Sequence, residues 1–144
     1  MKNRVFVAGV VLVGLTSTTA LAQNTVGEVL DAGGKKLSKA ELVPVLVGGN
    51  ISGPTQGGRQ MQVDYKADGT LAGNVQTANY KNAGRYGTWT VDDSGMLCVV
   101  LTTSGRVNSE AKSCGFFFNV GNQYFVSVDT GDRGARVLPR TIKK

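Results

Sequence analysis

Residues that could do acid–base or nucleophilic chemistry are few in this chain. None of its 144 residues is histidine, which excludes a Ser-His-Asp triad, a Cys-His pair and any zinc or haem site with histidine ligands. A carboxylate pair for hydrolysis of a glycosidic bond would have to come from Glu28, Asp64, Asp68 or Glu110. Most of the acidic residues fall in predicted turns, so we expect no catalysis and no cofactor. A carboxylate-dependent hydrolase of the cell envelope is the alternative.

The acidic residues and glycines give no pattern for binding a metal or a nucleotide. Asp92 and Asp93 are adjacent, and Asp129 lies near Asp132, but neither pair has the alternating oxygen ligands and closing glutamate of a calcium loop. The glycine-rich segment 48–58 lacks the Gly-Lys-Ser/Thr ending of a phosphate-binding loop. We expect no metal site, and a flexible loop over residues 48–58.

Two cysteines, Cys98 and Cys114, are the remaining reactive side chains. They are the only cysteines, and closing a loop of about 15 residues between them would stabilise the fold by about 3 kcal/mol. A reactive thiol pair is the alternative, but the spacing is not C-x-x-C and no histidine is present to lower a thiol pKa. A structural disulfide is therefore the prediction.

The first 22 residues have the three parts of a secretory signal peptide. Lys2 and Arg4 form a basic start, an apolar run of about 11 residues follows, and Ala20-Leu21-Ala22 is an A-x-A cleavage site. A membrane anchor would need roughly 20 apolar residues. We expect cleavage after Ala22, no membrane span afterwards, and a location in the periplasm or outside the cell, where disulfides form.

The net charge of +6 is spread along the chain. Only the last residues are locally basic, with Arg133, Arg136, Arg140, Lys143 and Lys144. No nucleic-acid-binding motif accompanies them, so we expect a solvated basic tail and no nucleic-acid partner.

One short helix is predicted near the start of the mature chain. Ser38 and Glu41 have the spacing of a capping box, and Leu37 and Leu42 have that of a hydrophobic staple, so the helix should begin at Lys39. Pro44 keeps it short. Residues 23–36, which are polar and contain glycine, are expected to form a flexible arm before a single domain over residues 37–144.

The rest of the chain has the pattern of short strands. Met61, Val63 and Tyr65 alternate with polar residues, and turn sequences such as Asp68-Gly69 and 92–95 separate this and later segments. Six to seven strands with one helix predict a mainly β fold, a small antiparallel barrel or half-barrel. The disulfide would join the strand beginning at Met96 to the phenylalanine-rich strand that follows Cys114.

Aromatic residues are the best candidates for binding. Consecutive residues Phe116, Phe117 and Phe118 must point to both faces of a strand. Burial against a helix or within the barrel wall explains them, and an apolar ligand cavity or partner surface is the functional alternative. The candidate binding face consists of Trp89, Phe117, Tyr124 and Phe125.

Several motifs occur in an order that resembles a known family. Gly87-x-Trp89 is followed by Gly95-x-Leu97-Cys98 and then by Cys114 before an aromatic strand. This pattern resembles an uncharacterised family of small secreted or periplasmic proteobacterial proteins. The resemblance implies a periplasmic, disulfide-bonded β domain and supplies no catalytic residues. We therefore expect a non-catalytic binding protein whose partner is an apolar small ligand or a protein of the cell envelope.

Overall fold

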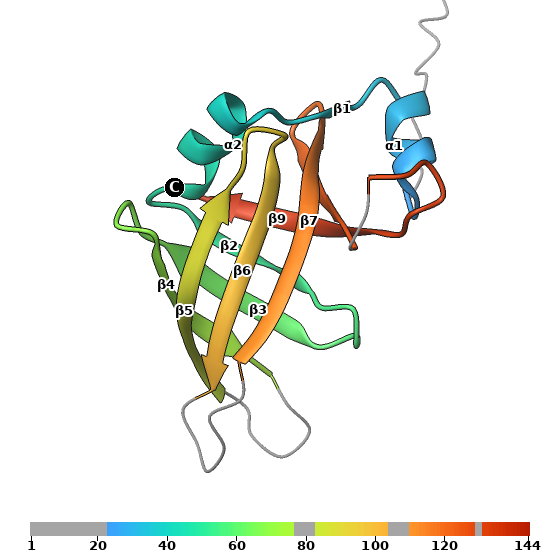
Figure 1. The fold of residues 1–144 in the computed structure, drawn as a ribbon. Coiled ribbons are helices and arrows are strands. Elements are labelled where there is room, and N and C mark those ends of the chain that lie inside the picture. Colours follow the sequence, from blue (N-terminus) through green and yellow to red (C-terminus); the bar gives the residue numbers. More distant parts are fainter. Residues whose placement is uncertain (1–22, 77–82, 104–109, 129–130) are drawn as a thin grey trace, which may run out of the picture.

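The computed structural model describes residues 23–76, 83–103, 110–128 and 131–144, and the predicted signal peptide over residues 1–22 lies outside them (Figure 1). In chain order the elements are α1 (Val26–Asp31), β1 (Lys35–Lys36), α2 (Lys39–Leu46), β2 (Asn50–Pro54), β3 (Gln60–Tyr65), β4 (Thr70–Val75), β5 (Ala83–Val91), β6 (Met96–Thr103), β7 (Glu110–Val120), β8 (Gln123–Ser127) and β9 (Val137–Lys143).

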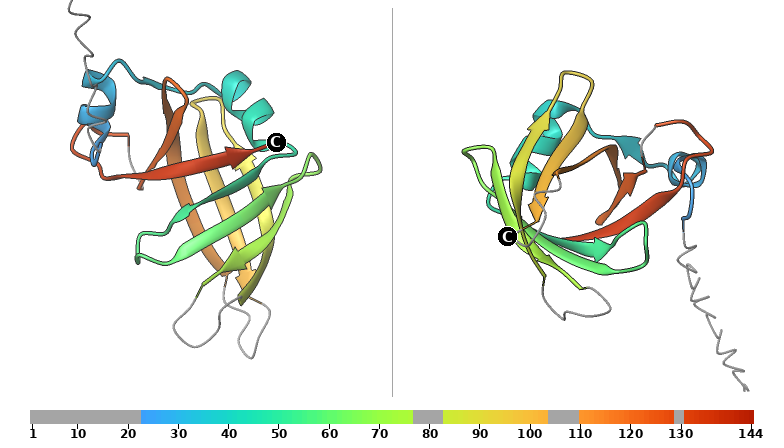
Figure 2. Two further views of the ribbon diagram at one scale, coloured as in Figure 1. Left: turned by 180° about the vertical axis from the view of Figure 1, so that it is seen from behind. Right: turned by 60° about the horizontal axis from the view of Figure 1, so that its bottom comes forward.

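Strands β2 to β9 form a closed antiparallel barrel in which each strand pairs with the next along the chain. The barrel closes where β2 pairs with β9, with Ile51 opposite Ile142. The right-hand view of Figure 2 shows the strands arranged as a ring. The prediction of a mainly β barrel is confirmed, but the count of six to seven strands is too low: the barrel has eight, and β1 pairs with β7 as a ninth.

The strands predicted from alternation are present. Val63 and Tyr65 of β3 are buried, while Gln62 and Asp64, which alternate with them, are exposed. The Asp68-Gly69 turn joins β3 to β4, with Gly69 at φ 82° and the Asp68 carboxylate accepting hydrogen bonds from the Thr70 N–H and hydroxyl. Asp92 forms the same type of turn between β5 and β6, where it accepts from Ser94 and from the Met96 N–H.

The two strands that close the barrel lie where the sequence predicts a flexible loop and a basic tail. Residues 50–54, inside the predicted loop 48–58, form β2, and Ile51 is 1% exposed in the barrel core. Residues 137–143 form β9, which pairs with β8 in its first half and with β2 in its second. Both expectations are wrong. These segments form strands because pairing satisfies their backbone N–H and C=O groups.

Helix α2 begins where the capping box predicts. The Ser38 hydroxyl accepts from the Glu41 N–H, and the Glu41 carboxylate accepts from the Ser38 N–H. Pro44 lies inside the helix, which ends at Leu46. Leu42 and Leu46 are completely buried against the barrel core.

Residues 23–36 fold onto the barrel, although their composition predicts a flexible arm and a single helix in the whole domain. Thr25 and Glu28 form a second capping box, which begins α1. Val26 and Val29 of this helix are completely buried with Phe118, Phe125 and Val137 in a second apolar cluster. Since Phe117 belongs to the barrel core and Phe118 to this outer cluster, both faces of β7 are covered.

The predicted disulfide is present. Cys98 and Cys114 lie directly opposite each other on β6 and β7, with their Cα atoms 4.1 Å apart. The bridge therefore joins two neighbouring strands that backbone hydrogen bonds already pair.

Candidate functional site: a cavity inside the barrel

A cavity of about 230 Å³, partly open to solvent, lies between the barrel strands. Its wall consists mainly of inward-facing apolar side chains from several strands, among them Met61, Val63, Leu97, Val99, Leu101 and Phe117. These residues occupy alternate positions along β3, β6 and β7, as a strand requires if one of its faces lines the interior. The alternation of apolar and polar residues that predicts the strands thus also places these apolar side chains in the cavity wall.

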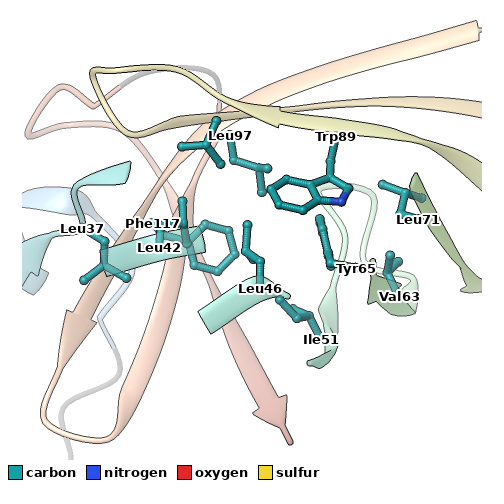
Figure 3. Packing of buried hydrophobic residues seen from close by; sticks show 11 residues of the cluster. Leu37, Leu42, Leu46, Ile51, Val63, Tyr65, Leu71, Trp89, Leu97 and Phe117 are labelled. Carbon is teal, nitrogen blue, oxygen red and sulfur yellow. The ribbon is translucent and has the colours of Figure 1, made fainter. Parts of the chain in front are cut away.

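Helix α2 covers one end of the barrel. Figure 3 shows Leu42 and Leu46 of this helix close to Phe117 and Ile51, with Trp89 and Tyr65 further along the interior. The Tyr65 and Trp89 rings are edge to face, with centroids 5.7 Å apart. Because these side chains fill the end under α2, the open volume lies further from the helix, where the lining includes Thr55 and Gln56 beyond the end of β2.

Arg140 of β9 is the charged residue in the lining. Its Nη1 donates to the carbonyl oxygens of Pro54 and Pro139, both at 2.8 Å. Gly53 allows this close approach of the two strands: a Cβ on Gly53 would clash with the Pro139 carbonyl oxygen and would lie 3.0 Å from Arg140 Nη1. Burial lowers the pKa of the Arg140 guanidinium to about 10, and the nearby Tyr65 opposes the shift. The side chain therefore remains positively charged at neutral pH.

Tyr65 supplies a neutral polar group in the same lining. Burial raises the pKa of its hydroxyl to about 12, against a smaller opposite effect of Arg140. The hydroxyl is thus protonated at neutral pH and able to donate a hydrogen bond. Ser127 is also in the lining, but its hydroxyl already accepts from the Phe116 N–H at 2.8 Å. Arg140 and Tyr65 are thus polar groups of the cavity wall that could orient a ligand.

The four aromatic candidates from the sequence lie in different surroundings. Phe117 lines the cavity, and Trp89 is buried in the same core, under the β3–β4 turn. Phe125 is buried in the cluster beneath α1, and Tyr124 is half-buried next to the barrel core. Tyr124 and Phe125 also border a second hollow of about 660 Å³, together with polar residues such as Asn122 and Gln123. The structure therefore does not bring the four together on one face.

The carboxylates considered for hydrolysis have structural partners. Asp64 accepts from the Asn50 side chain at 2.6 Å, Asp68 holds its turn, and Glu28 caps α1. The side chain of Glu110 and the whole of Asp129 lie outside the described residues. Within the described ranges no three His, Cys, Asp or Glu side chains group as metal ligands.

Arg140 was not among the sequence candidates because the segment around it looks like a basic tail. Leu138, Arg140 and Ile142 nevertheless alternate with Pro139 and Thr141, which is the period of a strand. This alternation is the signal that places Arg140 on the inner face between two apolar residues.

Comparisons with protein families, with curated proteins and with solved structures found no match to this chain. In the part of the chain that the structure describes, no helix combines the length and apolar character needed to cross a membrane.

Proposed function

We propose that this protein binds a small apolar molecule inside its barrel, without catalysis, in the periplasm or outside the cell. The observation that carries the proposal is the largely apolar cavity of about 230 Å³ between the strands, with Arg140 and Tyr65 as polar groups in its lining. Apolar cavities with a few placed polar groups are the usual form of small-molecule sites.

The presence of the cavity favours a functional origin. Protein interiors are close-packed and contain few voids larger than a water molecule. A space of about 230 Å³ among the barrel side chains is large by comparison, and it favours a ligand that fills the space.

The cavity volume limits the size of the ligand. An engineered apolar cavity of about 150 Å³ binds benzene, and pockets for drug-sized ligands begin near 300 Å³. A volume of about 230 Å³ therefore suits a molecule with a single ring or a short alkyl chain.

The other hypotheses have less support. Among the described residues, Tyr86, which is 59% exposed, is the large hydrophobic side chain found exposed on the surface. A single exposed side chain does not form an apolar patch for an envelope partner. A hydrolase would need two carboxylates at one site, whereas Glu28, Asp64 and Asp68 serve a helix cap, a cross-strand hydrogen bond and a turn. The disulfide suits an oxidising compartment, as the signal peptide implies.

A matched pair of substitutions on β6 tests the proposal. Val99 lines the cavity, and the adjacent Val100 points to the opposite face. Val99→Phe should fill part of the cavity, keep or raise stability by up to about 2 kcal/mol, and weaken binding of propylbenzene and octan-1-ol. Val100→Phe should leave binding unchanged.

Thermal unfolding with each probe measures the effect. A saturating probe at about 100 times its dissociation constant should stabilise the wild type by about 2.7 kcal/mol. If Val99→Phe folds and is stabilised by the probes as strongly as the wild type, the barrel interior is not the binding site.

A further inference from the structure

We propose that the ligand is a small carboxylic acid with an apolar body, and that its carboxylate pairs with Arg140; this inference rests on the binding function proposed above. The carboxylate is the charged end of this ligand, whereas the apolar wall of the cavity accounts only for its apolar body.

Arg140 lines the barrel cavity, and it also borders the second hollow beside Tyr124. Ile51 points into the core, and Gly53, two residues later on β2, faces the same side. A Cβ on Gly53 would clash with the Pro139 carbonyl oxygen of β9 and would lie 3.0 Å from Arg140 Nη1 and 3.4 Å from Arg140 Cδ. The absence of a side chain at Gly53 thus allows the β9 backbone and the Arg140 guanidinium to lie close to β2, beside the cavity that Arg140 lines.

This arginine has no counterion among the described residues. The ion pairs there join Lys35 to Glu41, Lys39 to Asp93, and Arg133 to Asp31, and all of them are at the surface. Arg140 is half-buried, and a charge that is partly removed from water is costly unless an opposite charge or hydrogen bonds compensate it. Two carbonyl oxygens accept from Nη1, which compensates one nitrogen and leaves the positive charge unneutralised. An anionic ligand would neutralise it.

The unused donors of Arg140 define the anion. A guanidinium has five N–H groups, and the two bonds from Nη1 leave the edge formed by Nε and Nη2 without an acceptor in the described part of the chain. That edge matches the two oxygens of a carboxylate in a fork-to-fork pair. One positive charge balances a carboxylate, whereas a phosphate monoester carries nearly two negative charges.

Isothermal titration of the mature protein with octanoate and octanamide at pH 7 separates the charge from the apolar body. Wild type should bind octanoate at least about tenfold more tightly than octanamide, since a charge-assisted pair is lost in the amide. Arg140→Gln should bind the two probes equally, and Arg140→Lys should keep only part of the preference because a lysine has no fork. Arg133→Gln, which removes an exposed arginine, is the control for net charge and should behave as the wild type.

Each other outcome overturns the inference in a distinguishable way. Equal affinity of wild type for octanoate and octanamide would leave the apolar binding function standing and remove the role of Arg140. Tighter binding of octyl phosphate than of octanoate would replace the carboxylate by a phosphate. If wild type binds none of these probes, nor propylbenzene and octan-1-ol, the proposed function fails together with the inference. The wild-type comparison decides the question even if the Arg140 variants do not fold.

Discussion

Trp89 illustrates how a polar atom is accommodated inside this apolar barrel. Its indole Nε1–H donates to the carbonyl oxygens of Lys66 and Thr70, at 3.0 and 3.1 Å, on the two sides of the β3–β4 turn. The ring therefore connects β5 to this turn while its carbon atoms pack in the core. Tyr65, in edge contact with the same ring, makes no hydrogen bond through its hydroxyl to any described residue.

This difference predicts the effects of two substitutions to phenylalanine. Trp89→Phe removes the Nε1–H donor and part of the packing, and should lower the free energy of unfolding by about 1–3 kcal/mol. Tyr65→Phe removes a hydroxyl without a protein partner and should change stability by less than about 0.5 kcal/mol. Urea unfolding followed by far-UV circular dichroism measures both. A larger loss in Tyr65→Phe than in Trp89→Phe would contradict the assigned hydrogen bonds.

Glu41 gives the fold a specific acid sensitivity. The hydrogen bond from Lys35, followed by those from the Ser38 N–H and hydroxyl, lowers the pKa of the Glu41 carboxyl from 4.5 to about 2. A lowered folded-state pKa means that the ionised carboxylate stabilises the fold above pH 4.5. This contribution is lost as the pH falls from about 4.5 to about 2.

Thermal unfolding between pH 6 and pH 2 tests this assignment. The wild-type midpoint should fall most steeply below pH 4.5, and Glu41→Gln should reduce that fall. Part of the fall should remain, because hydrogen bonds also lower the pKa values of Asp68 and Asp92. Lys35→Met removes the hydrogen bond that lowers the Glu41 pKa most, so the steep fall of the unfolding midpoint should shift toward higher pH. If the unfolding midpoints of wild type and Glu41→Gln fall in parallel as the pH is lowered, the Glu41 carboxylate is not the cause of the acid sensitivity.

Among the elements, helix α2 covers one end of the barrel, and hydrogen bonds fix both ends of the helix. Its first turn is fixed by the Ser38–Glu41 capping box. At its last turn the Lys144 Nζ donates to the carbonyl oxygens of Pro44 and Val47, which would otherwise lack partners as the helix ends. Lys144 follows β9 directly, so the strand that closes the barrel also holds the helix that covers it.

Truncation of the covering helix should therefore destabilise the whole domain. Leu46 is completely buried in the barrel core, and Leu46→Ala should cost about 2–5 kcal/mol because a cavity is left behind. Val45, its half-buried neighbour, provides the control: Val45→Ala should cost about 1 kcal/mol. Urea unfolding measures the loss in free energy of unfolding for both variants. Equal costs would mean that α2 does not pack on the core as the structure has it.

The elements that could be predicted from the sequence are those with a local pattern. Alternation predicted β3, and the Ser38–Glu41 box predicted α2. β2 has only Ile51 and Gly53 at inward positions, and in β9 the charged Arg140 stands between the apolar Leu138 and Ile142, so the alternating pattern is weak in both strands. Helix α1 carries the capping sequence Thr25-x-x-Glu28, but its burial depends on a distant cluster with Phe118 and Val137.

On the scale of the whole molecule, closure of the barrel creates the candidate site. The sequence predicts strands but not their closure, which requires the distant segments β2 and β9 to pair. That pairing brings Gly53, Pro54 and Arg140 together and encloses the cavity. Of the aromatic residues proposed from the sequence, Phe117 lines this cavity, because position along a strand and not aromatic character decides which side chains reach it.

Native mass spectrometry of the mature protein, purified gently from its own host, tests the central claim most directly. The folded chain should carry an additional mass of a small molecule that disappears on denaturation, and identification of that molecule should reveal an apolar body with a carboxylate. A folded chain without added mass, which also gains no thermal stability from propylbenzene, octan-1-ol or octanoate, would contradict a ligand-binding role for the barrel interior.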